Sequence, residues 1–147
     1  MTREFDAPKH LVFEAWTTPE LVKRWWHANR GLVTVVEIDL RVGGTWRFAM
    51  VADDGIEVGF HGEYREIVPD VRIVSTEVYE GLPEGVTEEE GATVNTATFT
   101  EANERATLTL LIQATSKVSR DAIIDSGMEA GLQDALDLLE QTANSLR

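Results

Sequence analysis

The spacing of hydrophobic positions changes along the chain, from a helical period before residue 30 to a two-residue period after it. Near the start, hydrophobic residues recur three or four positions apart, as on one face of a helix: Leu11, Val12, Ala15 and Trp16. Thr18 followed by Pro19 is a typical start for a second helix. The pattern therefore predicts two short helices, at about 8–17 and 19–26. The segment "TREF" before them is predicted to be the stub of a strand.

Alternating hydrophobic and polar residues then predict six strands in succession, several of them separated by residues typical of turns. Their expected ranges are 32–40, 44–52, 56–68, 71–80, 92–101 and 104–114. A final amphipathic segment predicts a long helix from about Arg120 to Ser145, after an N-cap at Ser119. This order predicts an α+β fold in which a meandering antiparallel sheet packs against the C-terminal helix.

The turns between strands also predict which side chains face inward. A two-residue hairpin loop at Asp54-Gly55 pairs Phe48 with His61 and Trp46 with Glu63, which places these four side chains on one face. A second two-residue loop, at Pro69-Asp70, adds three side chains to that face: Val74, Thr76 and Val78. The same phase places four side chains on the opposite face: Arg47, Glu66, Ser75 and Glu77.

The last hairpin is predicted to turn at Ala102-Asn103. This turn groups two sets of inward side chains: Asn95, Ala97 and Phe99 with Leu108, Leu110 and Ile112. The inward surface is then mainly apolar, with a polar minority of His61, Glu63, Thr76 and Asn95. Because a dry core rarely keeps a Glu and a His without partners, these polar groups point to a site.

The predicted C-terminal helix carries an apolar stripe that begins beside two glycines. The stripe consists of Met128, Leu132, Ala135 and Leu139, and the glycines are Gly127 and Gly131. Each glycine costs a helix about 1 kcal/mol relative to alanine, so their presence calls for a reason. Two reasons remain open at this point: the glycines leave space for a cavity between helix and sheet, or they allow close backbone packing.

Composition narrows the classes of function. The chain has 147 residues, 43% of them hydrophobic, which predicts a single domain over residues 1–147. Its 13 basic and 26 acidic residues give a formal charge of −13, which disfavours nucleic acid and anionic membranes as partners. There is no cysteine, no apolar run long enough to cross a bilayer and no secretion signal, so a cytoplasmic location is expected.

One segment, "EGLPEGVTEEEG" at 80–91, is acidic and longer than an ordinary hairpin loop. It is either a flap beside a pocket or a solvated loop. The chain contains no HExxH, GxSxG or P-loop motif, so no metal, no cofactor and no catalytic residue are expected.

Four segments resemble, in order, those of the START-like superfamily, in the branch homologous to the activator of the heat-shock-protein-90 ATPase. They are "REFDAPKHLVFEAWTTPELVKRWW", "DLRVGGTWRF", "HGEYREIVPDVRIVSTEVYEG" and "SGMEAGLQDALDLLEQ". The resemblance implies a helix-grip fold, with an antiparallel sheet of six to seven strands curled around the long C-terminal helix and a cavity near two short helices. In the family the first strand begins several residues before "REFDAP", so here a shortened edge strand is expected, or a misassigned start.

The superfamily includes hydrophobic-ligand carriers, co-chaperones and polyketide cyclases, and fold alone does not choose among them. The leading hypothesis is a non-enzymatic protein that binds a small hydrophobic molecule. Apolar walls would come from Trp46, Phe48, Val74, Phe99, Met128 and Leu132, and polar contacts from His61, Glu63, Thr76 and Asn95. The alternatives are a co-chaperone-like module that binds a protein partner and a cyclase-type enzyme that uses His61 and Glu63 as an acid/base pair.

Overall fold

The computed structural model of the chain describes residues 2–80, 85, 87–114, 116–117 and 128–147. Over these residues, antiparallel strands form one seven-stranded sheet in the spatial order β1-β7-β6-β5-β4-β3-β2. The strands are β1 (Thr2–Phe5), β2 (Gly31–Ile38), β3 (Thr45–Ala52), β4 (Glu57–Val68), β5 (Arg72–Tyr79), β6 (Thr93–Ala102) and β7 (Arg105–Ala114). The predicted strand stub and all six predicted strands are therefore confirmed.

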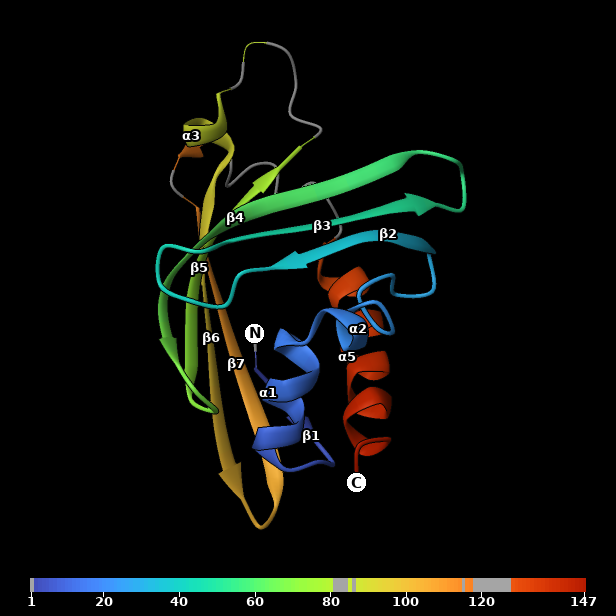
Figure 1. Cartoon of the computed structure of the whole chain (residues 1–147), viewed down its shortest axis with the longest axis vertical. Helices are drawn as coiled ribbons and strands as arrows, with labels where there is room; N and C mark the ends of the chain where they lie inside the picture. The colour runs from blue at the N-terminus through green and yellow to red at the C-terminus, as the bar shows by residue number, and fades with distance from the viewer. Residues whose placement is uncertain (1, 81–84, 86, 115, 118–127) are drawn as a thin grey trace.

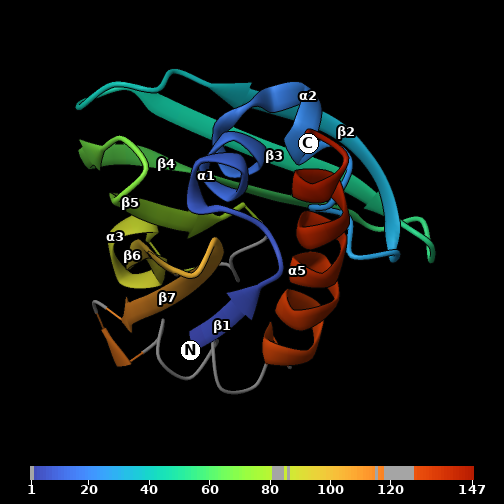
Figure 2. The ribbon, with the colours of Figure 1, turned by 90° about the horizontal axis from the view of Figure 1, so that it is seen from below.

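The helices whose bounds lie within the described residues are α1 (Lys9–Thr17), α2 (Pro19–Val22), α3 (Glu88–Gly91) and α5 (Met128–Asn144). Figure 2 shows that the sheet curves around α1 and α5, which both lie on its concave side. The α+β helix-grip fold expected from the sequence is confirmed. None of the helices described is both long enough and apolar enough to span a membrane.

The second helix is shorter than predicted, because it ends at Val22 instead of residue 26. The chain then makes a series of turns in which Ala28 and Asn29 have positive φ angles of 52° and 59°. The predicted start of the long helix, residues 119–127, lies outside the described residues, as does most of the segment 81–86. The rest of the acidic segment includes α3, which Thr87 and Glu90 begin with a reciprocal capping box.

Side chains of α1 and of the C-terminal half of α5 form a buried core with side chains of β1, β6 and β7. We call this region the packed end, and define it by six fully or almost fully buried side chains: Phe5, Val12, Phe99, Leu108, Leu136 and Leu139. Phe13 meets Phe99 edge-on there, with ring centroids 5.5 Å apart. Large aliphatic and aromatic side chains from α1, α5, β1, β6 and β7 thus fill this end of the space between helix and sheet.

The predicted pairing of β3 with β4 is wrong by one residue. Ala52 donates a hydrogen bond to the carbonyl of Ile56, so the loop between them has three residues, and Gly55 closes it with φ of 85°. Phe48 consequently pairs with Phe60 instead of His61, and Trp46 pairs with Gly62 instead of Glu63. Because a shift of one residue exchanges the two faces of a strand, His61 and Glu63 lie on the convex face.

The phase error carries over into β5. His61 pairs with Val78, so the two do share a face as predicted, but it is the outer face and not the inward one. Val74 and Thr76 lie on that outer face too, whereas four side chains of β5 and its end face inward: Ile73, Ser75, Glu77 and Tyr79. The loop after β4, which contains Asp70 with φ of 60°, is one residue longer than predicted. A register shift between Tyr64 and Glu66 compensates for this extra residue.

The last hairpin also turns one residue later than predicted, at Asn103 and Glu104, which have φ angles of 54° and 63°. The inward faces are nevertheless as predicted, since Asn95 pairs with Ile112 and Phe99 pairs with Leu108. Displacing a two-residue turn by one position changes the pairing by two residues, and an even change keeps every side chain on its face.

Candidate ligand-binding pocket

Beyond the packed end, the concave face of the sheet and the first turns of α5 enclose a pocket of about 840 Å³. Its lining comes from β3 to β7, from α1, α3 and α5, and from the segment that follows α2. All four tryptophans of the chain line it: Trp16, Trp25, Trp26 and Trp46. The lining is therefore mainly aromatic and aliphatic, with a small number of polar groups.

The turns after α2 bring two adjacent tryptophans to the pocket in different ways. Trp25 is 4% exposed, stacks on Trp16 with ring centroids 5.2 Å apart and donates its indole N–H to the carbonyl of Ala15. Trp26 packs edge-on against Phe48 and Phe60, at 5.7 and 5.9 Å between centroids. Trp25 is thus anchored in the core, while Trp26 extends the aromatic surface of the sheet.

Five rings form a connected surface, which we call the aromatic wall: Trp26, Trp46, Phe48, Phe60 and Tyr79. Trp46 contacts Phe48 at 5.0 Å between centroids, and Phe60 contacts Tyr79 at 5.2 Å. Trp46 lies across Gly62, because a Cβ atom at that glycine would approach the indole Nε1 to 2.8 Å. The same indole N–H donates to the carbonyl of Thr76 at 3.1 Å, which fixes the ring beside β5.

Four polar side chains interrupt this apolar lining on two neighbouring strands, and we call them the polar cluster: Ser75, Glu77, Thr93 and Asn95. The Thr93 hydroxyl donates to Asn95 Oδ1 at 3.0 Å, and Asn95 Nδ2 donates to Glu77 Oε2 at 2.7 Å. Burial raises the pKa of Glu77, and the hydrogen bond from Asn95 only partly opposes that effect. Among the described residues, no cation forms an ion pair with Glu77.

Arg30 and His27 also line the pocket, beside α5. Arg30 forms an ion pair with Asp134 at 2.9 Å, and a Cβ atom at Gly131 would lie 2.9 Å from Arg30 Nη1. Gly131 therefore leaves room for the guanidinium and, at the same time, contributes to the pocket lining. Gly127, the other glycine that the sequence analysis singled out, lies outside the described residues.

The structure brings only some of the predicted site residues to the pocket. Trp46, Phe48, Asn95 and Leu132 line it. Phe99 is instead 1% exposed in the packed end, and Val74 and Thr76 lie on the convex face with His61 and Glu63. The side chain of Met128 is not among those that the structure describes.

His61 belongs to a charged network on the convex face. Its Nδ1 lies 2.9 Å from Glu80 and its Nε2 lies 3.1 Å from Glu88, while Arg47 binds Glu80 through two nitrogens. Hydrogen bonds from Arg47 and, more weakly, from His61 hold the pKa of Glu80 below its usual range. Because His61 and Glu63 face away from the pocket, the hypothesis that they act as an acid/base pair on a molecule held there is wrong.

Sequence reasoning missed the polar residue at the centre of the cluster, Glu77, and two rings of the aromatic wall: Phe60 and Tyr79. One signal was available in β4, where Val58, Phe60 and Tyr64 alternate with Glu57, His61 and Glu63. The alternation places the apolar set inward without any assumption about the turn. No metal-binding group of three or more His, Asp or Glu residues occurs within the described ranges.

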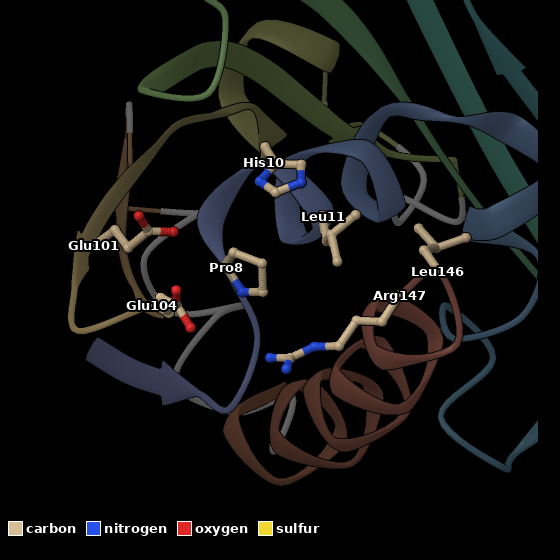
Figure 3. Close-up of a pocket in the computed structure, with 7 residues that line it drawn as sticks. All are labelled: Pro8, His10, Leu11, Glu101, Glu104, Leu146 and Arg147. Atoms are coloured by element: carbon tan, nitrogen blue, oxygen red, sulfur yellow. The ribbon is translucent and has the colours of Figure 1, made fainter.

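A second, smaller hollow of about 500 Å³ lies near the opposite end of the molecule, beside the start of α1 and the C-terminus (Figure 3). Two of its charged groups already have partners, since Glu101 accepts the backbone N–H of Lys9 and Arg147 donates to the carbonyl of Asp6. Figure 3 shows its side chains spread around the rim of the hollow. This hollow lacks the aromatic lining of the larger pocket.

Comparison with known proteins agrees with this architecture. The model of the family described as activator of Hsp90 ATPase homolog 1-like protein matches residues 6–144. A search of curated proteins found no match to the chain. Among solved structures, a protein from Rhodobacter sphaeroides is similar with a TM-score of 0.85 and 23% identity, over 99% of this chain and 91% of that one.

Two further structures are similar over nearly the whole chain. A protein from Arthrobacter aurescens has a TM-score of 0.83 and 22% identity, with 98% of this chain and 84% of that chain covered. A protein from Staphylococcus epidermidis has a TM-score of 0.79 and 26% identity, with 100% of this chain and 89% of that chain covered. These likenesses are likenesses of fold, and they name no ligand.

Proposed function

The chain belongs to the activator of Hsp90 ATPase homolog 1-like family, and we propose that this member binds a small, largely hydrophobic molecule in the pocket between its sheet and α5. The observation that carries the proposal is the combination of the aromatic wall with one polar cluster in a single concave space. Small-molecule sites are typically hollows of about 300–1,000 Å³ with an apolar lining and a few polar groups that fix orientation.

The contrast with the packed end supports the same function. A protein interior is normally filled to the density of an organic crystal, because each unfilled volume forfeits dispersion contacts. The chain achieves such packing around Phe99, Leu136 and Leu139, which are all at most 1% exposed. An aromatic-lined space that the same chain leaves open is therefore expected to have an occupant.

A substitution that adds side-chain volume to the pocket, away from the core, provides the test. Gly131→Leu would place an isobutyl group at the pocket lining, and Gln141→Leu places the same group on the exposed side of α5 as the matched control. We expect native mass spectrometry of freshly purified wild-type protein to show extra mass that leaves on denaturation. The mass should also be present in the control and absent from Gly131→Leu.

Nile red, a neutral hydrophobic dye, gives the test a second readout. Its fluorescence should rise on binding to the wild type and the control, with at least about tenfold weaker binding to Gly131→Leu, the change expected when an occupied apolar site is blocked. If the wild type carried no extra mass and bound no dye, the proposal would be wrong. A protein partner captured equally by all three proteins would then favour the co-chaperone-like alternative.

A further inference from the structure

We propose that the molecule held in the pocket is a hydrophobic amine, bound as a cation with its nitrogen at Glu77. This inference rests on the proposed function and narrows it to one chemical class. It follows from three features of the pocket: which charge lacks a partner, which hydrogen-bonding positions remain available, and which rings stand beside them.

The first feature is the balance of charge around the pocket. Arg30 is paired with Asp134 at 2.9 Å, and the Nδ1 atom of His27 accepts the backbone N–H of Asn29 at 2.9 Å. Among the described residues, the Glu77 carboxylate forms no ion pair, and its hydrogen-bond partner is the neutral amide of Asn95. A carboxylate removed from water is stabilised most by an opposite charge. Glu77 is therefore the group with which a cationic ligand would form an ion pair.

The second feature is the orientation of the amide. Thr93 donates to Asn95 Oδ1, so the Asn95 Nδ2 group is turned toward Glu77 and donates to Oε2. In this arrangement the Glu77 carboxylate acts as an acceptor, and one N–H uses only part of the roughly four acceptor positions that a carboxylate has. The cluster therefore offers acceptor positions at Glu77, and a ligand group that fits there is a donor such as an ammonium.

The third feature is the aromatic surface on either side of Glu77. Tyr79 is two residues along β5 on the same face, and the indole of Trp46 is tied to the carbonyl of Thr76, the residue directly before Glu77. The faces of aromatic rings attract cations, and together with a carboxylate they are a frequent environment for ammonium groups. The rest of the aromatic wall would hold the apolar part of the same molecule.

A neutral hydroxyl is the competing occupant. Burial favours the protonated form of Glu77, and an alcohol could hydrogen-bond to either form without any ionic attraction. An ammonium at the same position would favour the ionised carboxylate instead. The two classes of ligand therefore differ in how their affinity responds to the charge of Glu77.

The experiment compares three probes that share one apolar skeleton: 4-phenylbutylamine, 4-phenylbutanol and 4-phenylbutyrate. Binding is followed at pH 7.5 by the fluorescence of the tryptophans, all of which line the pocket. We expect the amine to bind at least about tenfold more tightly than the alcohol, and the carboxylate to bind most weakly, as charge pairing in a partly desolvated site predicts.

Glu77→Gln should reduce the affinity for the amine to within about threefold of that for the alcohol, because it removes the ionic part of the interaction. Glu63→Gln is the matched control, since it removes an exposed carboxylate from the outer face of the same sheet and should change none of the affinities. Thermal unfolding of both variants verifies that they are folded.

Wild-type protein supplies an independent measurement. Between pH 7.5 and 4.5 the affinity for the amine should fall as Glu77 takes up a proton, while the affinity for the alcohol should stay constant. If amine and alcohol bound equally well and neither responded to pH or to Glu77→Gln, the amine inference would be wrong while hydrophobic binding stood. If no probe bound, both the inference and the proposed function would be contradicted.

Discussion

The two ends of the space between α5 and the sheet are built from the same elements but packed in opposite ways. At the packed end, Leu136 and Leu139 are fully buried in the core to which α1, β1, β6 and β7 also contribute side chains. At the other end, Gly131 and Leu132 face the pocket, and the sheet opposite them presents aromatic rings and the polar cluster. Figure 1 shows α5 running along the length of the fold, so one helix serves both ends.

Side-chain size along α5 therefore separates the part of the helix that stabilises the fold from the part that lines the pocket. Leucines at the C-terminal half of α5 supply the buried area that stabilises the fold. A glycine near its start leaves volume, which Arg30 and the pocket share. Changes at the packed end should therefore affect stability, and changes at the pocket end should mainly affect binding.

The greatest change in stability is expected when a leucine of α5 is truncated at the packed end. Leu139→Ala should lower the free energy of unfolding by about 3 kcal/mol, because it leaves a cavity in a packed core. Leu132→Ala, on the same helix but at the pocket, should cost less than about 1 kcal/mol, because its side chain is already next to open space. Urea unfolding of both variants measures the difference, and equal losses would show that the pocket end is packed like the core.

The next effect concerns the carboxylate in the pocket. In the absence of ligand, Glu77→Gln should raise the free energy of unfolding at pH 7.5 by on the order of 1 kcal/mol, because the variant no longer buries a charged group. The raised pKa of Glu77 also means that the wild type should lose stability as the pH rises from about 4.3, the usual carboxyl value, to the raised folded value.

That pH dependence has a definite sign because the folded state binds the proton more tightly than the unfolded chain does. Above the folded pKa the destabilisation is complete, and below about 4.3 it is absent. Urea unfolding at several pH values should show this slope in the wild type and not in Glu77→Gln. An unchanged slope in the variant would assign the effect to another group.

A smaller net effect is expected at Gly131. Gly131→Leu should change the free energy of unfolding by less than about 1 kcal/mol, because the gain in helix propensity offsets the displacement of Arg30. The added atoms meet the end of a flexible side chain, which is able to move. A loss of several kcal/mol, measured by urea unfolding, would instead mean that this part of α5 is tightly packed.

The smallest effect should come from the convex face, which serves as the reference for the pocket carboxylate. Glu80→Gln should lower stability at neutral pH by about 0.5 kcal/mol, because it removes a largely exposed ion pair with Arg47. The lowered pKa of Glu80 gives the opposite sign to Glu77: this contribution is present above about 4.3 and is lost as the pH falls through the folded value. Acid unfolding of the variant would measure it.

The order and the ranges of the strands could be predicted because hydrophobic period and turn residues are local signals. The face of the sheet on which each side chain lies was harder to predict, because it depends on whether a turn has two or three residues. The turn before Glu57 contains one residue more than predicted, and His61 and Glu63 were therefore predicted on the wrong face of the sheet. The turn at Asn103 and Glu104 was also displaced, but by an even register change, and its faces were predicted correctly.

Other features of the site could not be predicted from local pattern. The turns after α2 need positive φ at Ala28 and Asn29, and alanine in particular rarely signals such a conformation. The path of these turns decides that Trp26 joins the aromatic wall. The polar cluster depends on a register shift beside Tyr64, which no turn residue marks.

The central claim is that the pocket end of α5 and the sheet binds a ligand while the packed end does not. The most direct test is an NMR titration of ¹⁵N-labelled protein with 4-phenylbutylamine. We expect shifts at the tryptophan indole N–H groups and at the backbone amides around Glu77 and Asn95, with residues 136–143 unchanged. Shifts concentrated at residues 136–143, or spread over the convex face around His61 and Glu80, would contradict it.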